Sequence, residues 1–475
     1  MTDDKSKKHY WKNAGLFAYK LLHFLLVLFS FYAAWLFFRY NGKPNIQDVA
    51  FRYNYYIFIG YSLIIYFFHR TYNTYLLGYS RIRTLVLSQT ISQIFSVMII
   101  YFVVALAWMR FINPLILIGL LVFQFVLNVV WCYTATRIYS KVNPPRKTIL
   151  VYRNQLDRKR FGSVRGKPSG RLYRIENEIM YDGNFVDLVD ELEGYEAVFV
   201  AGVNSRCRNG ILKFCQERNI PGFFLPHVGD VIMLQAQHIQ SFDSPVMYVS
   251  QKTLNIEYAV IKRAFDIAAS LIGLIALSPI LIITAIAIRV YDGGPAIYKQ
   301  VRLTKGGREF KIWKFRSMRV DAEKDGVARL SSGDNDDRIT PIGRIVRKCR
   351  LDELPQLVNI LRGDMSVVGP RPERPEIAEQ YYKTMPDFHL RLQVKAGLTG
   401  YAQVYGKYNT DPYEKLEFDL MYIKNMSVLT DLRLMFATFR ILFMAESTEG
   451  IEGGHTTALM TESDLAEQND RAETN

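Results

Sequence analysis

Two adjacent carboxylates in the second half of the chain have basic residues close by in the sequence. Asp352 and Glu353 lie within IGRIVRKCRLDELPQLVNILRG, residues 342–363, and Arg347 and Lys348 precede them by about one helical turn. Nearby positive charge lowers carboxylate pKa values, so both acids are expected to be ionised. An ionised aspartate beside phosphate-binding arginines can attack phosphorus or hold Mg²⁺. A solvated helix start, with two acids beside a proline, explains this one stretch equally well.

At helical spacing, the same stretch has an apolar and a polar face. The apolar face consists of Leu351, Leu354, Val358 and Leu361. Asp352, Gln356 and Asn359 share the polar face. Downstream, GDMSVVGPRPERP at 363–375 is a Gly/Pro turn that presents Arg371. Either Arg371 binds a phosphate there, or the glycines and prolines only form a loop.

The region around the acids is strongly basic. Between residues 295 and 350, fifteen Lys or Arg accompany seven Asp or Glu, and the whole chain has a formal charge of +14. Such a charge suits nucleic acid, an anionic membrane surface or phosphorylated substrates. Because the chain also has membrane segments, the last two are favoured, and no nucleic-acid partner is expected.

Four apolar stretches near the N-terminus are candidates to cross a bilayer, which takes about 20 residues as helix. They are residues 15–38, 53–68, 85–109 and 114–139. The second is short and contains several tyrosines. Basic residues flank the start of the first stretch, the connection between the second and third, and the end of the fourth. Both ends of this four-span region are therefore expected in the cytoplasm.

Strand-like and helix-like stretches alternate after the last span, which predicts a small parallel α/β domain. Strands are expected at 147–152, 197–201 and 221–226, and helices at 185–192 and 204–218. The turn after the first strand reads RNQLDRKRFG and has no Gly-x-Gly-x-x-Gly for a pyrophosphate. We therefore predict a Rossmann-like domain without a dinucleotide site, in a structural, oligomerising or regulatory role.

Residues 267–288 carry no charge and have the length of a fifth span. Basic residues flank both ends, which favours placing both ends on the same side of the membrane. Ser278 and Pro279 lie at the centre, where proline removes a backbone donor and kinks the helix. We predict a helix that enters one leaflet, breaks at this pair and returns to the same face. An ordinary proline-kinked span is the alternative.

Seven motifs, in order, give residues 258–454 a resemblance to the bacterial sugar transferase, or polyprenyl phosphosugar transferase, family. They are KRAFD at 262–266, SP at 278–279, FKIWKFRSM at 310–318, RLDELPQL at 350–357, GDMSVVGPRP at 363–372, GLTGYAQVYG at 397–406 and FDLMYIKNMSVLTDL at 418–432. The ordered set is far more specific than any single motif. With its N-terminal spans and α/β domain, the chain resembles the long members that initiate exopolysaccharide or capsule synthesis.

The resemblance implies a transfer in two steps through a covalent intermediate. Asp352 would attack the β-phosphorus of a UDP-sugar and release UMP, and undecaprenyl phosphate would then accept the hexose 1-phosphate. Glu353 would assist Mg²⁺ or proton handling, and Asp352 would be the metal ligand. The basic positions that match phosphate contacts are Lys314, Arg347, Arg371 and Lys407. The family commonly has arginine at the last position, and lysine lacks its bidentate geometry.

The predicted architecture is that of a membrane protein of the α plus α/β class. It consists of a four-helix transmembrane unit (1–144), the Rossmann-like domain (145–250), an α-rich catalytic domain (251–445) with the re-entrant helix (260–290), and a mostly disordered acidic tail (446–475). The catalytic domain is expected on the cytoplasmic side of the bacterial inner membrane. Four spans and a spare α/β domain are compatible with a homodimer.

The sequence leaves the transferred sugar open, and two other classes of protein compete with the transferase. Glucose and galactose are the usual sugars of the long members, but no residue here decides between them. A membrane-tethered nucleotide-sugar dehydratase would also combine spans with an α/β domain, but it needs the glycine-rich cofactor turn that this chain lacks. A non-enzymatic scaffold for polysaccharide assembly would not need the intact LDELPQ and GPRP motifs.

Overall fold

The computed structural model divides into two compact units, residues 1–225 and 226–475, and each is described by itself. The described residues are 2–41, 50–107, 109, 113–162, 172–234, 236–239, 246–249, 256–320, 322, 338–406 and 411–442. Lys407 and the acidic tail (446–475), for which we made predictions, lie outside them.

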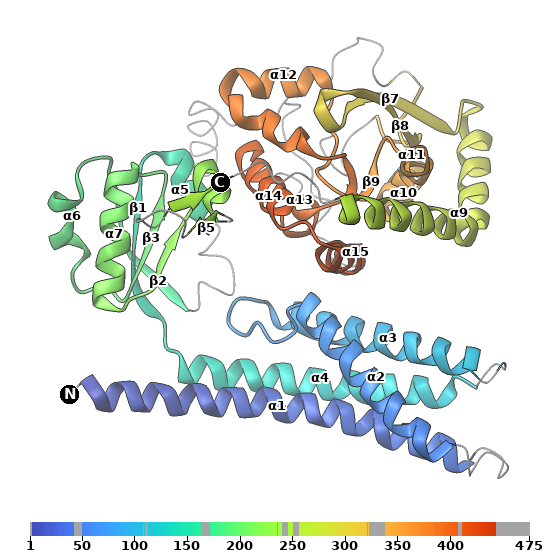
Figure 1. Ribbon diagram of the computed structural model, residues 1–475, viewed down its shortest axis with the longest axis horizontal. Helices are drawn as coiled ribbons and strands as arrows, with labels where there is room; N and C mark the ends of the chain where they lie inside the picture. The colour runs from blue at the N-terminus through green and yellow to red at the C-terminus, as the bar shows by residue number, and fades with distance from the viewer. Residues whose placement is uncertain are drawn as a thin grey trace. The chain divides into compact units, whose positions relative to one another are not determined.

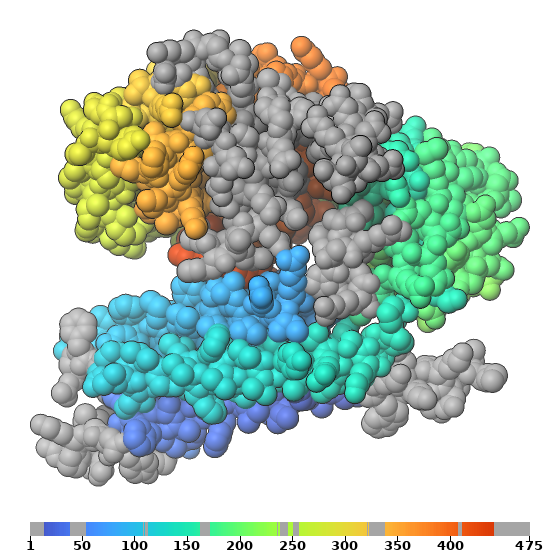
Figure 2. Space-filling model, turned by 180° about the vertical axis from the view of Figure 1, so that it is seen from behind, coloured from blue at the N-terminus to red at the C-terminus, as the bar shows by residue number. Residues whose placement is uncertain are grey.

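Four long helices open the first unit (Figure 1). They are α1 (Thr2–Asn41), α2 (Ala50–Thr71), α3 (Ile82–Ala107) and α4 (Leu115–Val142). Residues Ala14–Phe38 of α1, together with α3 and α4, are long and apolar enough to cross a membrane. Helix α2, the short and tyrosine-rich predicted span, does not reach that combination of length and apolarity. Helices α1 and α4 lie side by side in both views (Figure 1 and Figure 2), and α2 packs against α3.

Polar side chains join these apolar helices inside the bundle. Asn128 of α4 donates a hydrogen bond of 2.7 Å to Gln93 of α3 and lies 3.2 Å from a ring nitrogen of His23 on α1. Trp35 of α1 donates to Asn54 of α2 at 2.9 Å. Because apolar helices have no hydrophobic reason to associate in lipid, such hydrogen bonds stabilise their packing.

A four-stranded parallel sheet follows α4, in the order β2-β1-β3-β4. Its elements are β1 (Arg146–Tyr152), α5 (Gln155–Gly162), β2 (Tyr173–Met180), α6 (Phe185–Leu192), β3 (Ala197–Ala201), α7 (Ser205–Arg218) and β4 (Gly222–Phe224). The predicted strands at β1, β3 and β4 and the predicted helices at α6 and α7 are confirmed. We missed α5, whose polar side chains give no apolar period for a pattern to detect. We also missed the edge strand β2, although Tyr173, Ile175 and Ile179 alternate there with polar residues.

A carboxylate from the first turn of α5 lies beside the end of β3. Gly202, directly after β3, has φ of +69°, and a Cβ there would lie 1.8 Å from Oδ2 of Asp157 in α5. Asn154 holds this turn by accepting a 2.8 Å hydrogen bond from the amide of Asp157. Gly202 leaves room for this carboxylate because it has no Cβ. The absence of a dinucleotide site stays a prediction.

The second unit starts with a short helix, α8 (Val228–Met233), and a hairpin of β5 (Gln237–Ile239) and β6 (Val246–Tyr248). Val228 and Val231 lie in the core of this unit. Helix α8 therefore packs with the core of the second unit, whereas we predicted it within the α/β domain.

The rest of the second unit is rich in helices, as predicted. The elements are α9 (Ile256–Asp292), β7 (Ile297–Leu303), β8 (Glu309–Phe315), α10 (Pro341–Lys348), α11 (Gln356–Arg362), β9 (Ser366–Val368), α12 (Pro375–Thr384), β10 (Gly397–Thr399), α13 (Tyr401–Tyr405), α14 (Pro412–Lys424) and α15 (Val428–Leu442). Strands β7 and β8 form an antiparallel hairpin, and β9 and β10 form a parallel pair.

Helix α9 consists of two arms that meet at a bend (Figure 1), and Pro279 lies in its interior. Proline has no N–H, so the carbonyl of Ile275 loses its usual partner four residues later. The hydroxyl of Ser278 donates to that carbonyl at 2.8 Å instead. The Ser-Pro pair therefore interrupts the helix without leaving this carbonyl unsatisfied, as an apolar environment requires.

Both arms of α9 are joined to the same small core. Near its start, Arg263 donates to two carbonyls of α11 at 2.6 and 2.7 Å. At its end, Asp292 forms an ion pair with Arg316, which follows β8. Helix α11 and strand β8 are themselves joined, since Asn359 accepts from the backbone N–H of Trp313 at 2.9 Å. A straight helix would separate residues 263 and 292 by about 44 Å, so the bend returns α9 to the domain that it left.

Candidate active site

The helix expected through the acidic pair is broken into three pieces. Helix α10 begins after Thr340, whose hydroxyl accepts from Gly343 N at 2.9 Å, and ends at Lys348. Arg350 then has a left-handed backbone with φ of 55°, and Leu351–Glu353 form a 3₁₀ turn before α11. A residue with a Cβ is strained in this conformation by about 1–2 kcal/mol, so surrounding packing must impose the break. The acidic pair therefore lies on a turn between two helices.

The buried face of α11 also differs from the predicted one. Leu357 and Ile360 lie in the core. The four residues of the predicted apolar face are only partly buried: Leu351, Leu354, Val358 and Leu361. Asn359, expected on the polar face, is buried, and its amide forms a 2.9 Å hydrogen bond to the backbone of β8 through each end. Asn359 therefore fixes α11 to β8.

Glu353 is joined to the segment that carries Arg371. Its Oε1 accepts from Nη2 of Arg371 at 2.8 Å, and Nη1 of Arg350 lies 3.9 Å from its other oxygen. Burial alone would raise the pKa of Glu353, but the charges of Arg371, Lys314 and Arg350 outweigh it and lower the pKa to about 2. Glu353 is thus ionised at neutral pH, as predicted.

Asp352 is partly buried beside the same cations, but its carboxylate is not engaged by them. Among the residues that the structure describes, none forms a hydrogen bond or an ion pair with it. Burial and the charge of Glu353 raise its pKa to about 6, although Lys314, Arg347 and Arg371 act in the opposite direction. Our expectation that the cations lower the pKa of both acids was wrong for Asp352, since burial and its acidic neighbour outweigh them. The carboxylate is still mostly ionised at neutral pH.

Three of the four predicted phosphate-binding residues gather around the acidic pair. Lys314 lies on β8 next to the 3₁₀ turn, and burial and the charge of Arg371 lower its pKa to about 8. Arg347 comes from the last turn of α10 and donates to Ser317 Oγ at 2.8 Å. Lys407, the fourth, is not among the described residues. One free carboxylate is therefore accompanied by three groups that are cationic at neutral pH.

Arg371 belongs to residues 369–374, which connect β9 to α12 and which we call the arginine loop. Two prolines restrict its backbone. Five consecutive carbonyls accept hydrogen bonds: Pro370 from Gly397 N at 2.8 Å, Arg371 from Arg391 Nη2 at 2.8 Å, Pro372 from Arg302 Nη1 at 3.1 Å, Glu373 from Leu303 N at 3.0 Å and Arg374 from Ala378 N at 2.9 Å. Because five of its six carbonyls are engaged, the loop fixes the backbone that carries the Arg371 side chain.

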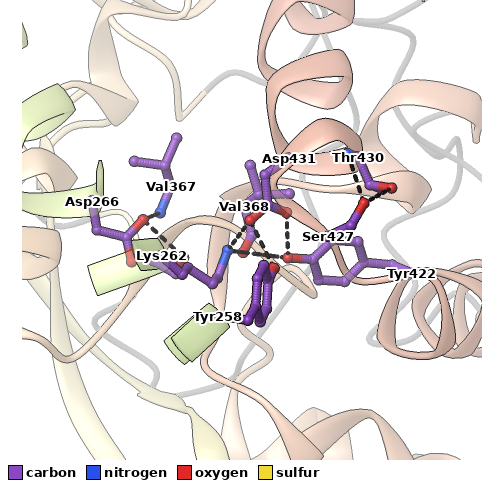
Figure 3. A network of polar contacts seen from close by, with 10 residues as sticks. Tyr258, Lys262, Asp266, Val367, Val368, Tyr422, Ser427, Thr430 and Asp431 are labelled. Carbon is purple, nitrogen blue, oxygen red and sulfur yellow. Dashed lines mark hydrogen bonds and ion pairs between the residues drawn. The ribbon is translucent and has the colours of Figure 1, made fainter. Parts of the chain in front are cut away.

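A buried polar network joins the start of α9 to β9 and α15 (Figure 3). Lys262 of α9 donates to Asp431 Oδ2 at 2.8 Å and to the carbonyl of Val368 at 3.1 Å. Asp431 also accepts from the hydroxyls of Tyr258 and Tyr422, at 2.9 and 2.8 Å. Since Val368 is the last residue of β9, the network fixes the long apolar helix to the strand that leads into the arginine loop.

Breaking this network is expected to lower stability strongly. Asp431→Asn leaves the Lys262 ammonium buried without its ion-pair partner, which costs about 3–5 kcal/mol. For a domain of this size, the thermal unfolding midpoint of the purified protein should fall by roughly 6–20 °C. The control is Asp364→Asn, which removes an exposed ion pair with Arg308 and should shift the midpoint by no more than about 2 °C. Equal shifts in the two variants would contradict the role assigned to the network.

The two carboxylates suit a divalent cation only together with a substrate. Within the described ranges, no cluster of three or more His, Cys, Asp or Glu side chains could hold a metal. Glu353 is engaged by Arg371, which leaves Asp352 as the free oxygen donor. Mg²⁺ is usually bound by one or two carboxylates and by substrate phosphates, with several waters retained. The residues present therefore fit a Mg²⁺ ion that is shared with a diphosphate.

Comparison with known proteins agrees with the motifs. The sequence model of the bacterial sugar transferases matches residues 257–445. The UDP-N-acetylgalactosamine-undecaprenyl-phosphate N-acetylgalactosaminephosphotransferase of Aeromonas hydrophila is 41% identical over 188 residues, 39% of this chain and 44% of that protein. The UDP-glucose:undecaprenyl-phosphate glucose-1-phosphate transferase of Klebsiella pneumoniae is 40% identical over 220 residues, 45% of this chain and 47% of that protein.

These two matches span about half the length of each relative. A shorter relative is matched over nearly its whole length. The exopolysaccharide production protein PSS of Rhizobium leguminosarum bv. phaseoli is 42% identical over 188 residues, 38% of this chain and 93% of that protein. The motifs, the gathered acids and cations and these matches agree, and the chain belongs to the bacterial sugar transferase family.

Proposed function

We propose that this protein transfers a hexose 1-phosphate from a UDP-sugar to undecaprenyl phosphate. The observation that carries the proposal is the unengaged Asp352 carboxylate among Lys314, Arg347 and Arg371. A nucleophile needs a free lone pair, and a phosphoryl group in transfer needs positive charge around its oxygens. The relatives named for such reactions use UDP-glucose or UDP-N-acetylgalactosamine with undecaprenyl phosphate.

The transfer consists of two displacements at one phosphorus atom. An Asp352 oxygen attacks the β-phosphorus of the UDP-sugar, and the bond to the bridging oxygen breaks, so that UMP leaves with that oxygen. A phosphate oxygen of undecaprenyl phosphate then attacks the phosphosugar-aspartate, and the bond from phosphorus to Asp352 breaks. Each step exchanges one P–O bond for another, and the carboxylate is restored at the end. Asp352 only needs to be ionised at the start, which its pKa of about 6 permits at neutral pH.

The cations stabilise the charge that the phosphoryl oxygens carry during both steps. Arg371 is already held by Glu353 and by its loop before a substrate arrives, so little reorganisation is needed. Lys314 is charged at neutral pH and lies beside Asp352 and Glu353. Asp352 is the residue that would hold Mg²⁺, and the ion, when bound, supplies further positive charge to the diphosphate.

The shape and surface of α9 support an insertion into one leaflet. The helix is long and apolar enough to cross a membrane, and its Ile272 and Ile275 side chains are each 66% exposed. Because both arms are joined to the catalytic core, we propose that α9 enters the inner leaflet, turns at Ser278 and Pro279 and returns to the cytoplasmic face. Asp352 can then meet a soluble UDP-sugar and a lipid phosphate on the same side.

Single cysteines at the two ends of α9 test this topology. In a background with the exposed Cys349 replaced by serine, Glu257→Cys and Pro295→Cys should both react with a membrane-impermeant maleimide in inside-out vesicles. Neither should react in right-side-out vesicles, because a re-entrant helix keeps both ends in the cytoplasm. Reaction of the two positions from opposite sides would show a full span and refute the proposal.

Release of UMP is the reaction that tests the function. Purified protein in lipid nanodiscs is supplied with undecaprenyl phosphate, Mg²⁺ and, in turn, UDP-glucose, UDP-galactose and their N-acetylated analogues. We expect UMP and a sugar-linked undecaprenyl diphosphate with at least one donor, and no turnover after Mg²⁺ is chelated. Such a lipid-linked sugar would initiate an exopolysaccharide or capsule repeat unit. No UMP from any of the four donors would contradict the proposal.

A further inference from the structure

We infer that Arg391, held by Asp419, is a positioning residue that fixes the arginine loop and thereby places Arg371 on the transferred phosphoryl group. The inference rests on the proposed function, because Arg371 matters to the reaction only if a phosphoryl group is transferred at Asp352. Neither Arg391 nor Asp419 contacts the acidic pair, so any effect on the reaction must pass through the loop.

The Arg391 guanidinium contacts the loop and α14 at once. The side chain comes from the 3₁₀ helix Pro386–Gln393 and is 3% exposed. Its Nε and Nη2 lie 2.8 and 2.7 Å from Oδ2 of Asp419, which is 1% exposed. Its Nη2 also donates to the carbonyl of Arg371 at 2.8 Å, and its Nη1 lies 3.6 Å from Oε1 of Glu373. One planar group thus fixes two residues of the arginine loop relative to α14.

The contact from Arg391 to the Arg371 carbonyl is the one that affects the position of the Arg371 side chain. This carbonyl belongs to the residue whose side chain reaches Glu353 at 2.8 Å, so a shift of that peptide moves the side chain directly. Arg302 holds the next carbonyl, that of Pro372, at 3.1 Å. Two guanidinium groups within the domain therefore set the orientation of consecutive peptides beside the acidic pair.

A buried ion pair is a weak source of stability, because removing both charges from water costs about as much as their attraction returns. Here the ion pair matters because it fixes the orientation of the Arg391 guanidinium. Arginine has several donors in one rigid plane, and the pairing with Asp419 restricts that plane to one orientation. Lysine keeps the charge but has no such plane, so it cannot engage Asp419 and the Arg371 carbonyl with the same geometry.

The first arm of the test compares Arg391→Lys with Ile423→Ala. Ile423 lies one turn beyond Asp419 on the same helix, is 2% exposed and makes no polar contact to the loop through its side chain. Both variants are expected to lower the unfolding midpoint. Only Arg391→Lys should lower kcat for UMP release, by about 10²-fold, because a small misplacement near reacting groups has effects of this size. A similar loss of kcat in Ile423→Ala would mean that Arg391 affects the rate only by stabilising the fold, and would overturn the inference.

The second arm asks whether Arg391 acts through Arg371. In an Arg371→Ala background, Arg391→Lys should lower kcat by no more than about twofold further, since the side chain that it positions is already gone. A further loss of about 10²-fold would mean that the two residues act independently, and would overturn the inference.

Hydrogen exchange provides a readout that does not depend on turnover. Amides of residues 366–374 should exchange faster in Arg391→Lys than in the unsubstituted protein, and at an unchanged rate in Ile423→Ala. Unchanged exchange in Arg391→Lys would overturn the inference even if the enzyme is active. If the unsubstituted protein releases no UMP, the proposed function fails, and the exchange data still decide whether Arg391 holds the loop.

Discussion

Replacing Asp352 by asparagine should lower the rate of UMP release by about 10⁴-fold or more, which is the scale of losing a covalent nucleophile. Asparagine has the same shape, but its amide lacks the charged oxygen that attacks phosphorus. The fold should be retained, because no described residue loses a hydrogen bond or an ion pair with the change. Burial and the charge of Glu353 disfavour the ionised Asp352 side chain in the folded protein. The variant should therefore unfold at the same temperature as the unsubstituted protein, or at a higher one.

Two further measurements make this result specific to Asp352. Asp364→Asn, which removes a carboxylate paired with the exposed Arg308, should keep its rate within about twofold. Incubated with a UDP-sugar but without a lipid acceptor, the unsubstituted protein should gain the mass of one sugar phosphate, and Asp352→Asn should not. Turnover in Asp352→Asn equal to that of the unsubstituted protein would refute the covalent mechanism, as would an adduct on that variant.

The parts of the fold that the sequence predicts well have a strong local cause. Strand β3 is a run of five apolar residues, all buried, and α7 begins where Asn204 caps it by accepting from Cys207 N at 2.9 Å. Both signals are contained in a few consecutive residues. The break at Arg350 has no such signal, because an arginine adopts a positive φ only when distant packing requires it. The sequence therefore predicted a helix there, and the structure has a turn.

The candidate site was predicted mainly from the order of its motifs. Spacing alone placed Arg347 about one turn before Asp352. A solvated helix start explained that spacing equally well. Lys314 reaches the pair because the β7–β8 hairpin packs against α11, where Asn359 accepts from the backbone of a residue 46 positions earlier in the chain. No local pattern encodes such a contact. The structure brings these groups together, and their roles in the reaction remain predictions.

The pKa of Asp352 and the pair of Arg391 and Asp419 were missed for a related reason. Sequence shows which charges are near along the chain, but it does not show how far each is removed from water. Burial therefore raised the pKa of Asp352 against expectation. Arg391 and Asp419 are 28 positions apart, so no local pattern pairs them. Only the three-dimensional structure shows that their contact reaches the carbonyl of Arg371.

Removing the Arg371 side chain is expected to have the second largest effect, a loss of about 10²–10³-fold in kcat for UMP release. Arg371→Ala removes a preorganised donor to the phosphoryl oxygens and also takes away the partner that Glu353 holds at 2.8 Å. Arg371→Lys keeps the charge but lacks the planar set of guanidinium donors, so its rate should lie between those of the alanine variant and the unsubstituted protein. Arg308→Ala, which removes an exposed guanidinium outside the site, is the control and should stay within about twofold.

The double variant Arg371→Ala/Glu353→Gln separates the two roles of Arg371. If Arg371 only neutralised Glu353, removing the acid as well would restore the rate, because no buried charge would be left uncompensated. We expect the double variant to be at least as slow as Arg371→Ala, because the phosphoryl oxygens still lack their donor and the expected part of Glu353 in Mg²⁺ or proton handling is lost as well. Recovery to the rate of the unsubstituted protein would show that Arg371 does not act on the substrate. Asp352 would then depend on Lys314 and Arg347 for the positive charge that phosphoryl transfer needs.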